Sequence, residues 1–341
     1  MKQLTRTLQR FRPHLTWLSL ISAGLIIYLC SPSLALLILQ NPPATWPQTL
    51  GPPLQDFLTL TLSIIVEATP FLILGIIISG LIRRFLPPAR LVKLLPKQAV
   101  LRRLTLSMIG MALPVCECGN VPVARSLLAH GLKPADVISF LFAAPILNPI
   151  TIIATMSAFH FQPQMVWWRI LFALVIVHAV ATIVARLKPA TILQPAFQAS
   201  CRSHHGAPGL QRLLTDGRNE FWQLFTMLML GAMIAAATQV FVPRDIINAL
   251  GGDIILSVIA MIALGFIVSI CSSVDAFFAL AYASSFTTGS LLAFLLAGPM
   301  IDIKLIMLMK TTFRWRFILL VMGLIATLSL IIGVGVNLYV R

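Results

Sequence analysis

The sequence predicts an all-α integral membrane protein, a polytopic bundle of about eight to ten spans of about 20 residues each. Of its 341 residues, 58% are hydrophobic and only 10% are charged, whereas soluble domains carry about 25% charged residues. The apolar residues occur in long blocks separated by shorter polar stretches. We expect the bundle to consist of two inverted repeats, each with a broken-helix or re-entrant hairpin. A water-soluble globule is excluded.

Seven continuous apolar segments are expected to span the membrane. The first follows a basic N-terminal tail and is longer than the 7–15 apolar residues of a signal peptide, and no small-x-small cleavage site follows it, so we expect an uncleaved span. Two further regions, 104–130 and 254–285, are interrupted by polar residues. The continuous segments are 15–39, 57–82, 135–159, 165–187, 220–242, 290–309 and 317–340.

The basic residues predict the topology. The net charge of +15 comes from 25 Lys and Arg against 10 Asp and Glu, and the basic residues lie between apolar blocks rather than in one patch that would bind nucleic acid. If both interrupted regions are hairpins, the basic loops all fall on one side of the membrane. The sequence therefore predicts a multi-pass protein of the plasma (inner) membrane with a cytoplasmic N-terminus. The basic stretches are 1–14, 83–103, 186–219 and 310–316.

The two halves of the chain resemble each other across one polar linker. We expect a basic tail and first span at 1–53, a first membrane repeat at 54–187, a cytoplasmic polar linker at 188–216 and a second repeat at 217–341. The expected topology makes the repeats inverted, a common architecture of secondary transporters. Matching residues recur at offsets of 154 to 156: Glu67 and Gln223, Gly75 and Gly231, Cys116 and Cys271, Asn120 and Asp275, Pro145 and Pro299, and Asn148 and Asp302.

The densest group of polar residues runs from Pro114 to Pro122 with the sequence PVCECGNVP. Two prolines and a Gly-Asn pair argue against a continuous helix. In an extended backbone Cys116 and Cys118 point to the same side and can bind a soft ion, such as Cu(I) or Zn, or by analogy a trivalent arsenical. The alternative is that both cysteines are small buried apolar residues. Asn120 is expected near the start of a second half-helix, whose N–H groups point at the break.

Four acids lie within apolar segments, where a charge costs about 2.5–3.5 kcal/mol and usually marks a pathway or a proton relay. We expect Glu67, Glu117 and Asp275 to handle protons or cationic charge. Asp275 lies in the second polar break, CSSVD, which begins at Cys271. The fourth acid, Asp302, either contacts substrate or forms a structural pair with Lys304. Because residues two positions apart do not face each other on a helix, that pair requires a break in the helix. Arg125 is the other candidate basic partner.

Two further groups are weaker candidates. The segment PILNP at 145–149 is expected to break the span 135–159, and Asn148 then either orients substrate or makes a packing contact. In the linker, Cys201, His204 and His205 can form a regulatory metal site. The chain has five cysteines, an odd number mostly within apolar segments, so no disulfide framework is expected.

These motifs resemble those of the ArsP/YraQ-type predicted permeases. The resemblance rests on EATPFLILG at 67–75, on PVCECGNVP and on APILNP at 144–149, and more loosely on the second half; it covers about residues 54–312. It implies a permease fold and an export role, with Cys116, Cys118 and Glu67 as carried-over candidates. Some members of that family export trivalent organoarsenicals.

We therefore expect a permease, not an enzyme, that exports a small thiophilic metal or metalloid species by ion-coupled alternating access. The expected substrate-binding residues are Cys116, Cys118, Glu117, Asn120, Asn148, Cys271, Asp275 and Asp302. No cofactor is expected, and the absence of a GxxxxGK motif means that the energy comes from an ion gradient or a separate partner. Two alternatives stay open. One is a membrane thiol–disulfide oxidoreductase that uses Cys116 and Cys118, and the other is a membrane subunit of a larger transport complex.

Overall fold

The computed structural model describes residues 52–85, 91, 93–111, 116–202, 210–241 and 253–339. Within these ranges the chain is helical, and one isolated β-bridge joins Leu193 to Phe313. This confirms the predicted all-α class. The helices are α2 Pro52–Phe85, α4 Ala99–Met111, α5 Glu117–Ala129, α6 Pro134–Leu147, α7 Pro149–Ala158, α8 Gln164–Val184, α9 Pro189–Ile192, α10 Pro195–Arg202, α11 Leu210–Phe241, α13 Leu256–Val268, α14 Asp275–Ala281, α15 Thr288–Ala297, α16 Ile303–Lys310 and α17 Trp315–Tyr339.

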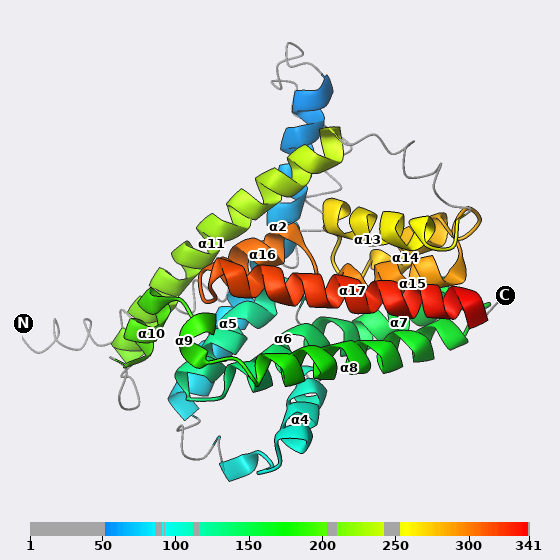
Figure 1. Cartoon of the computed structure of the whole chain (residues 1–341). Helices are drawn as coiled ribbons and strands as arrows, with labels where there is room; N and C mark the ends of the chain where they lie inside the picture. The colour runs from blue at the N-terminus through cyan, green and yellow to red at the C-terminus, as the bar shows by residue number, and fades with distance from the viewer. Residues whose placement is uncertain are drawn as a thin grey trace, which may run out of the picture.

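Four described helices, α2, α8, α11 and α17, are long and apolar enough to cross a membrane, and the bent pair α6 and α7 makes five. The long helices α2 and α11 pack against each other, while α8 packs against α6 and α17 against α15 (Figure 1). The expected first span, 15–39, lies outside the described residues. The inverted relationship of the two halves stays a prediction.

Both regions expected to be interrupted contain pairs of short helices, α4 with α5 and α13 with α14. Each of these helices has 13 residues or fewer, too few to cross a bilayer alone. The predicted break at Asn148 is also observed, because α6 ends at Leu147 and α7 begins at Pro149 with a bend of 40°.

The expectation of one continuous span over 290–309 is wrong. The chain leaves the helix between Ala297 and Ile303, so that α15 and α16 are separate. Asp302 explains where α16 begins, because its side chain accepts a hydrogen bond of 2.7 Å from the backbone N–H of Lys304 and caps the helix. Pro299 precedes this cap and lacks the N–H that a continuous helix would need.

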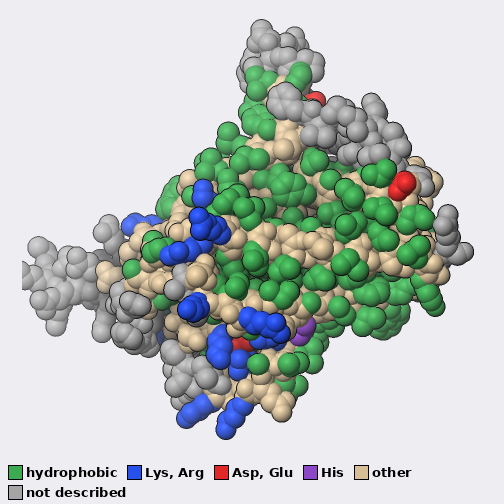
Figure 2. Space-filling model, viewed as in Figure 1, with side chains coloured by type: hydrophobic (Ala, Val, Ile, Leu, Met, Phe, Trp, Pro, Cys, Tyr) green, Lys and Arg blue, Asp and Glu red, His purple; other side chains and the backbone are tan. Residues whose placement is uncertain are grey.

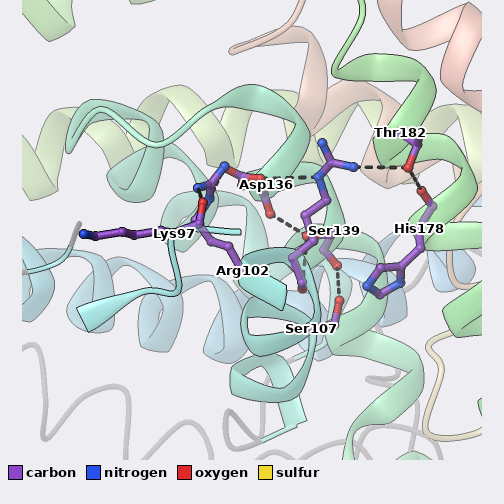
Figure 3. A network of polar contacts seen from close by, with 8 residues as sticks. Lys97, Arg102, Ser107, Asp136, Ser139, His178 and Thr182 are labelled. Carbon is purple, nitrogen blue, oxygen red and sulfur yellow. Dashed lines mark hydrogen bonds and ion pairs between the residues drawn. The ribbon is translucent and has the colours of Figure 1, made fainter. Parts of the chain in front are cut away.

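A network of polar contacts fixes α4 against α6 and α8 (Figure 3). Arg102 and Arg103 of α4 both reach the buried carboxylate of Asp136 on α6, at 2.7 and 3.4 Å. Arg103 also donates a 3.1 Å hydrogen bond to Thr182 of α8. The start of α4, the start of α6 and the end of α8 therefore meet at one end of the bundle.

We call this the basic end, because Lys and Arg side chains gather there. Figure 2 shows them over the lower left of the molecule, while apolar side chains cover most of the rest of that face. Arg83 joins the same end from α2 by pairing with Glu220 of α11, and Arg314 joins it through a hydrogen bond from its backbone N–H to Ile192 O. Arg84 lies in the same last turn of α2 as Arg83, and Lys310 lies in the last turn of α16.

Candidate functional site

The two halves of the chain meet at a buried group of cysteines and one carboxylate. Cys116 is the N-cap of α5, and Cys271 lies between α13 and α14. Three atoms lie within 4.8 Å of one another: the sulfurs of Cys116 and Cys271 and a carboxylate oxygen of Glu117. The Cys271 thiol lies 3.9 Å from Glu117 Oε2. The thiol of Cys118, which is also buried, lies close enough to that of Cys116 for the two to interact electrostatically. We call these four residues the thiol cluster.

The backbone leaves the helical conformation on both sides of the thiol cluster. Cys116 is extended, with φ −75° and ψ 178°. In the second half Ser269 ends α13 in the left-handed region at φ 50°, an uncommon conformation for a residue other than glycine. Irregular backbone at membrane depth requires surrounding protein or a water-filled cavity. Both breaks meet that requirement, because Cys116, Cys271 and Ser269 are all buried.

The local geometry around Cys116 differs from the expectation in one respect. We expected an extended backbone from Cys116 to Cys118 and a half-helix that starts near Asn120, but α5 already begins at Glu117 and includes Pro122. Pro122 is the sixth residue of α5 and therefore lies past the first turn, where a proline would cost no helical hydrogen bond. Its ring removes the N–H that would bond to the carbonyl of Cys118, so a backbone acceptor is freed beside the thiols.

Lys304 supplies the positive charge next to the thiol cluster. Its ammonium lies 3.3 Å from Asp302 and 3.7 Å from Glu117, and all three side chains are nearly fully buried. The predicted alternative for Asp302, a pair with Lys304 at a helix break, is therefore present. The sequence could not link this pair to Glu117, because Glu117 lies in the other half of the chain.

The two asparagines of the predicted site have different surroundings. Asn120 is fully buried, and neither its Oδ1 nor its Nδ2 has a hydrogen-bond partner within the described residues. It lies one helical turn after Cys116 and therefore shares its face of α5. Asn148 instead caps α7, because its Oδ1 accepts a 2.9 Å hydrogen bond from Ile150 N–H.

Asp275 lies outside the thiol cluster. It forms a two-point ion pair with Arg169 of α8, with N–O distances of 2.5 and 3.0 Å, and Arg169 also donates to Thr155 of α7 at 2.7 Å. Arg169 was not among the residues predicted from the sequence. The available signal was an arginine within the apolar segment 165–187, which needs a buried counter-charge or an interfacial position.

The expected role of Arg125 as a partner of the mid-span acids is wrong. Arg125 pairs instead with Glu220 of α11 at 3.3 Å and stacks over the ring of Phe197 in the linker helix α10. Glu67 also lies apart from the thiol cluster. Its side chain is exposed on α2, although it is close enough to act electrostatically on Glu117 and Cys271.

The linker contributes Cys201, which is half-buried at the end of α10. Burial raises the pKa of its thiol, and the nearby Arg125 and Arg83 oppose that shift. His204 and His205 lie outside the described residues, so the linker metal site stays a prediction. Among the residues that the structure describes, Cys116, Glu117 and Cys271 are the group of three that can hold a metal ion.

Comparison with known proteins agrees with this architecture. A family model described as "Predicted permease" (ArsP_1) matches residues 53–338. The chain is 35% identical over 276 residues to "UPF0718 protein YcgR" of Bacillus subtilis strain 168, covering 80% of this chain and 94% of that protein. It is 34% identical over 286 residues to "Putative two-component membrane permease complex subunit" of Streptococcus mutans, covering 81% and 95%.

No solved structure matches the chain. The family match spans both halves, including all four residues of the thiol cluster, and the two relatives are covered over nearly their whole length. The chain therefore belongs to the predicted permease family of membrane proteins.

Proposed function

We propose that this permease exports a small thiophilic metal or metalloid species, such as a trivalent organoarsenical, and binds it at Cys116, Cys118 and Cys271. The observation that carries the proposal is the convergence of cysteines from both halves of the chain at two helix breaks. Thiolates are the ligands that soft metals prefer. The chain offers no set of four ligands at zinc-finger spacing, so a transient site fits better than a structural one.

The position of the site supports alternating access. Cys116 and Cys118 come from the first half of the chain and Cys271 from the second, so both halves would bind the same ion. If the two halves rock against each other, the ion is exposed first on one side of the membrane and then on the other. We propose that the basic end faces the cytoplasm, in accordance with the positive-inside rule.

We propose ion coupling through Glu117 and Glu67. Glu117 lies between the thiols and Lys304, so the charge of a bound ion competes directly with the ammonium for the carboxylate. Glu67 lies on α2, close enough to act electrostatically on Glu117. The unpartnered amide of Asn120 is available to a polar group of the substrate.

Transport into vesicles tests the thiol role. Purified protein in liposomes is given a trivalent phenylarsenical, Cu(I) or Zn²⁺, with and without a pH gradient. Cys116→Ser with Cys118→Ser should abolish uptake of the transported species, whereas the matched control Cys201→Ser should leave it unchanged. Unchanged transport in the double variant at equal expression overturns the proposal.

A second candidate function is a subunit of a two-component permease. It is favoured by the name of the Streptococcus mutans relative, which describes a complex subunit. Transport by the purified chain alone argues against it, whereas transport only after a second membrane protein is added supports it. The oxidoreductase alternative has less support, because Cys116 and Cys118 are 7% and 1% exposed and exchange with a partner needs accessible thiols.

A further inference from the structure

Two groups of charged residues, all buried except the partly exposed Arg83, join the first half of the chain to the second. One is the pair of Arg169 on α8 with Asp275 on α14, which we call the far-end pair. The other consists of Arg83 on α2 and Arg125 on α5, both paired with Glu220 on α11, which we call the basic-end cluster. Neither group contains a residue of the thiol cluster.

The far-end pair is completely buried. Both side chains are 2% exposed, and both guanidinium NH₂ groups contact the two carboxylate oxygens. Thr155 accepts a further hydrogen bond from Arg169, so α7 and α8 of the first half are tied to the start of α14 in the second. Within the described chain, no acceptor reaches the Nε of Arg169.

The basic-end cluster also crosses between the halves. Glu220 accepts from Arg83 at 2.6 Å and lies 3.3 Å from Arg125. Arg125 reaches further into the second half, donating to Thr311 at 2.7 Å and to Gln223 at 3.0 Å. This cluster therefore ties α2 and α5 to α11 and the end of α16.

The two groups lie at opposite ends of the thiol cluster. Arg125 is nine residues after Cys116, so α5 carries it about 13 Å toward the basic end at 1.5 Å per residue. The far-end pair lies directly beyond the thiol cluster on the side of α7 and α14. The backbone N–H of Asp275 donates to Cys271 O at 3.2 Å, and Arg169 lies in the second turn of α8. Figure 1 shows the same arrangement, with α5 toward the left of the bundle and α7 and α14 toward the right.

We propose that the far-end pair and the basic-end cluster are two gates that close opposite ends of the pathway to the thiol cluster. With both formed, the site is closed to solvent at each end, and Cys116, Cys118 and Cys271 are accordingly all buried. Opening toward one end requires the gate at that end to separate while the other stays closed. This inference rests on the proposed function only in that the halves move during transport.

Energetics favours a gating role over a purely stabilising one for the far-end pair. Desolvating two charges offsets most of their attraction, so a buried ion pair stabilises a fold little compared with apolar side chains of similar size. The unsatisfied Nε of Arg169 weakens it further. Such a pair is suited to an interface that has to separate, because hydration of the freed charges compensates for the lost attraction.

Thiol accessibility from each side of the membrane tests the gates without any substrate. Cys30 and Cys201 are replaced by Ser, so that the cysteines of the thiol cluster are the only ones left in the chain. A membrane-impermeant, positively charged methanethiosulfonate is then added to one face of reconstituted vesicles of known orientation. The rate of labelling is followed by mass spectrometry.

We expect Asp275→Asn to speed labelling from the far end by at least about tenfold, because it makes the state open at that end more populated, and to leave labelling from the basic end unchanged. Glu220→Gln should show the converse. The control is Asp136→Asn, which breaks the ion pairs of Asp136 with Arg102 and Arg103 inside the first half and should change neither rate. If Asp275→Asn does not yield folded protein, Arg169→Lys keeps the charge, loses the two-point contact and should give a smaller increase in the same direction.

Exchange of the charges, Arg169→Asp with Asp275→Arg, should restore slow labelling. The gates are refuted if Asp275→Asn speeds labelling equally from both ends or not at all, or if Asp136→Asn has the same effect. The outcome is separable from the proposed function. If Cys116→Ser with Cys118→Ser leaves transport intact, the thiol role fails, while labelling of Cys271 still reports on the gates.

Discussion

Lys304→Met should strongly destabilise the protein, because it leaves two buried carboxylates without their shared cation. The ammonium lies 3.3 Å from Asp302 and 3.7 Å from Glu117. At an effective dielectric constant of about 20 these contacts correspond to about 5 and about 4.5 kcal/mol of gross Coulomb attraction. Desolvation offsets much of this, and removing one partner of a buried pair typically costs about 3–5 kcal/mol. We expect a loss in that range.

A second substitution should recover most of the loss. With formal charges, Glu117, Asp302 and Lys304 sum to −1, Lys304→Met makes the sum −2, and adding Glu117→Gln returns it to −1. The free energy of unfolding of each variant is measured by SDS titration in mixed micelles, as a double-mutant cycle. The reasoning fails if Lys304→Met costs less than about 1 kcal/mol, or if the costs of the two substitutions simply add.

Three further outcomes are expected. Gly75→Ala should lower the free energy of unfolding by about 1–3 kcal/mol through overpacking, because a Cβ there would overlap the backbone of α5. The control is Gly323→Ala, which has open space around it and should be neutral in the same SDS titration. Treatment with diamide should cross-link Cys116 to Cys271, giving a disulfide-linked pair of peptides that mass spectrometry detects and dithiothreitol removes. Absence of the link in protein whose Cys116 and Cys271 both react with N-ethylmaleimide contradicts their proximity. Asp253→Ala should lower the melting temperature at pH 7, because two backbone N–H groups at the start of α13 donate to the Asp253 carboxylate and lower its pKa below 3.8. This stabilisation is complete above the ordinary pKa of 3.8 and is lost as the pH falls through the lowered pKa of the folded protein. A deficit of the variant that persists below that lowered pKa would contradict the capping role.

The helix breaks were largely predictable, since proline and helix-capping residues act locally. The segment around Asn148 illustrates this, because Pro149 and the Asn148 cap lie next to each other in the sequence and the break occurs where they predict it. The break at Asp302 has the same cause, but the apolar run 290–309 concealed it. The hydrophobicity of this run predicted one continuous span, whereas the structure shows that the capping residue Asp302 decides where α16 begins.

The partners of the buried charges were much less predictable. Asp275 and Arg169 are 106 residues apart, and the sequence carries no sign that they meet. Arg125 was matched with the mid-span acids, although its partner is Glu220 on α11. In each case, a charge within an apolar segment indicates that a partner exists without indicating which one.

The sequence by itself determined the membrane environment, the all-α class and the positions of most breaks, because these depend on the hydrophobicity of about 20 consecutive residues and on the local chemistry of proline and capping side chains. Only the tertiary structure decided that Cys116, Glu117 and Cys271 converge and that Lys304 lies beside them. Their proximity depends on how α5, α13 and α16 pack, and that packing is set by contacts between residues far apart in the chain.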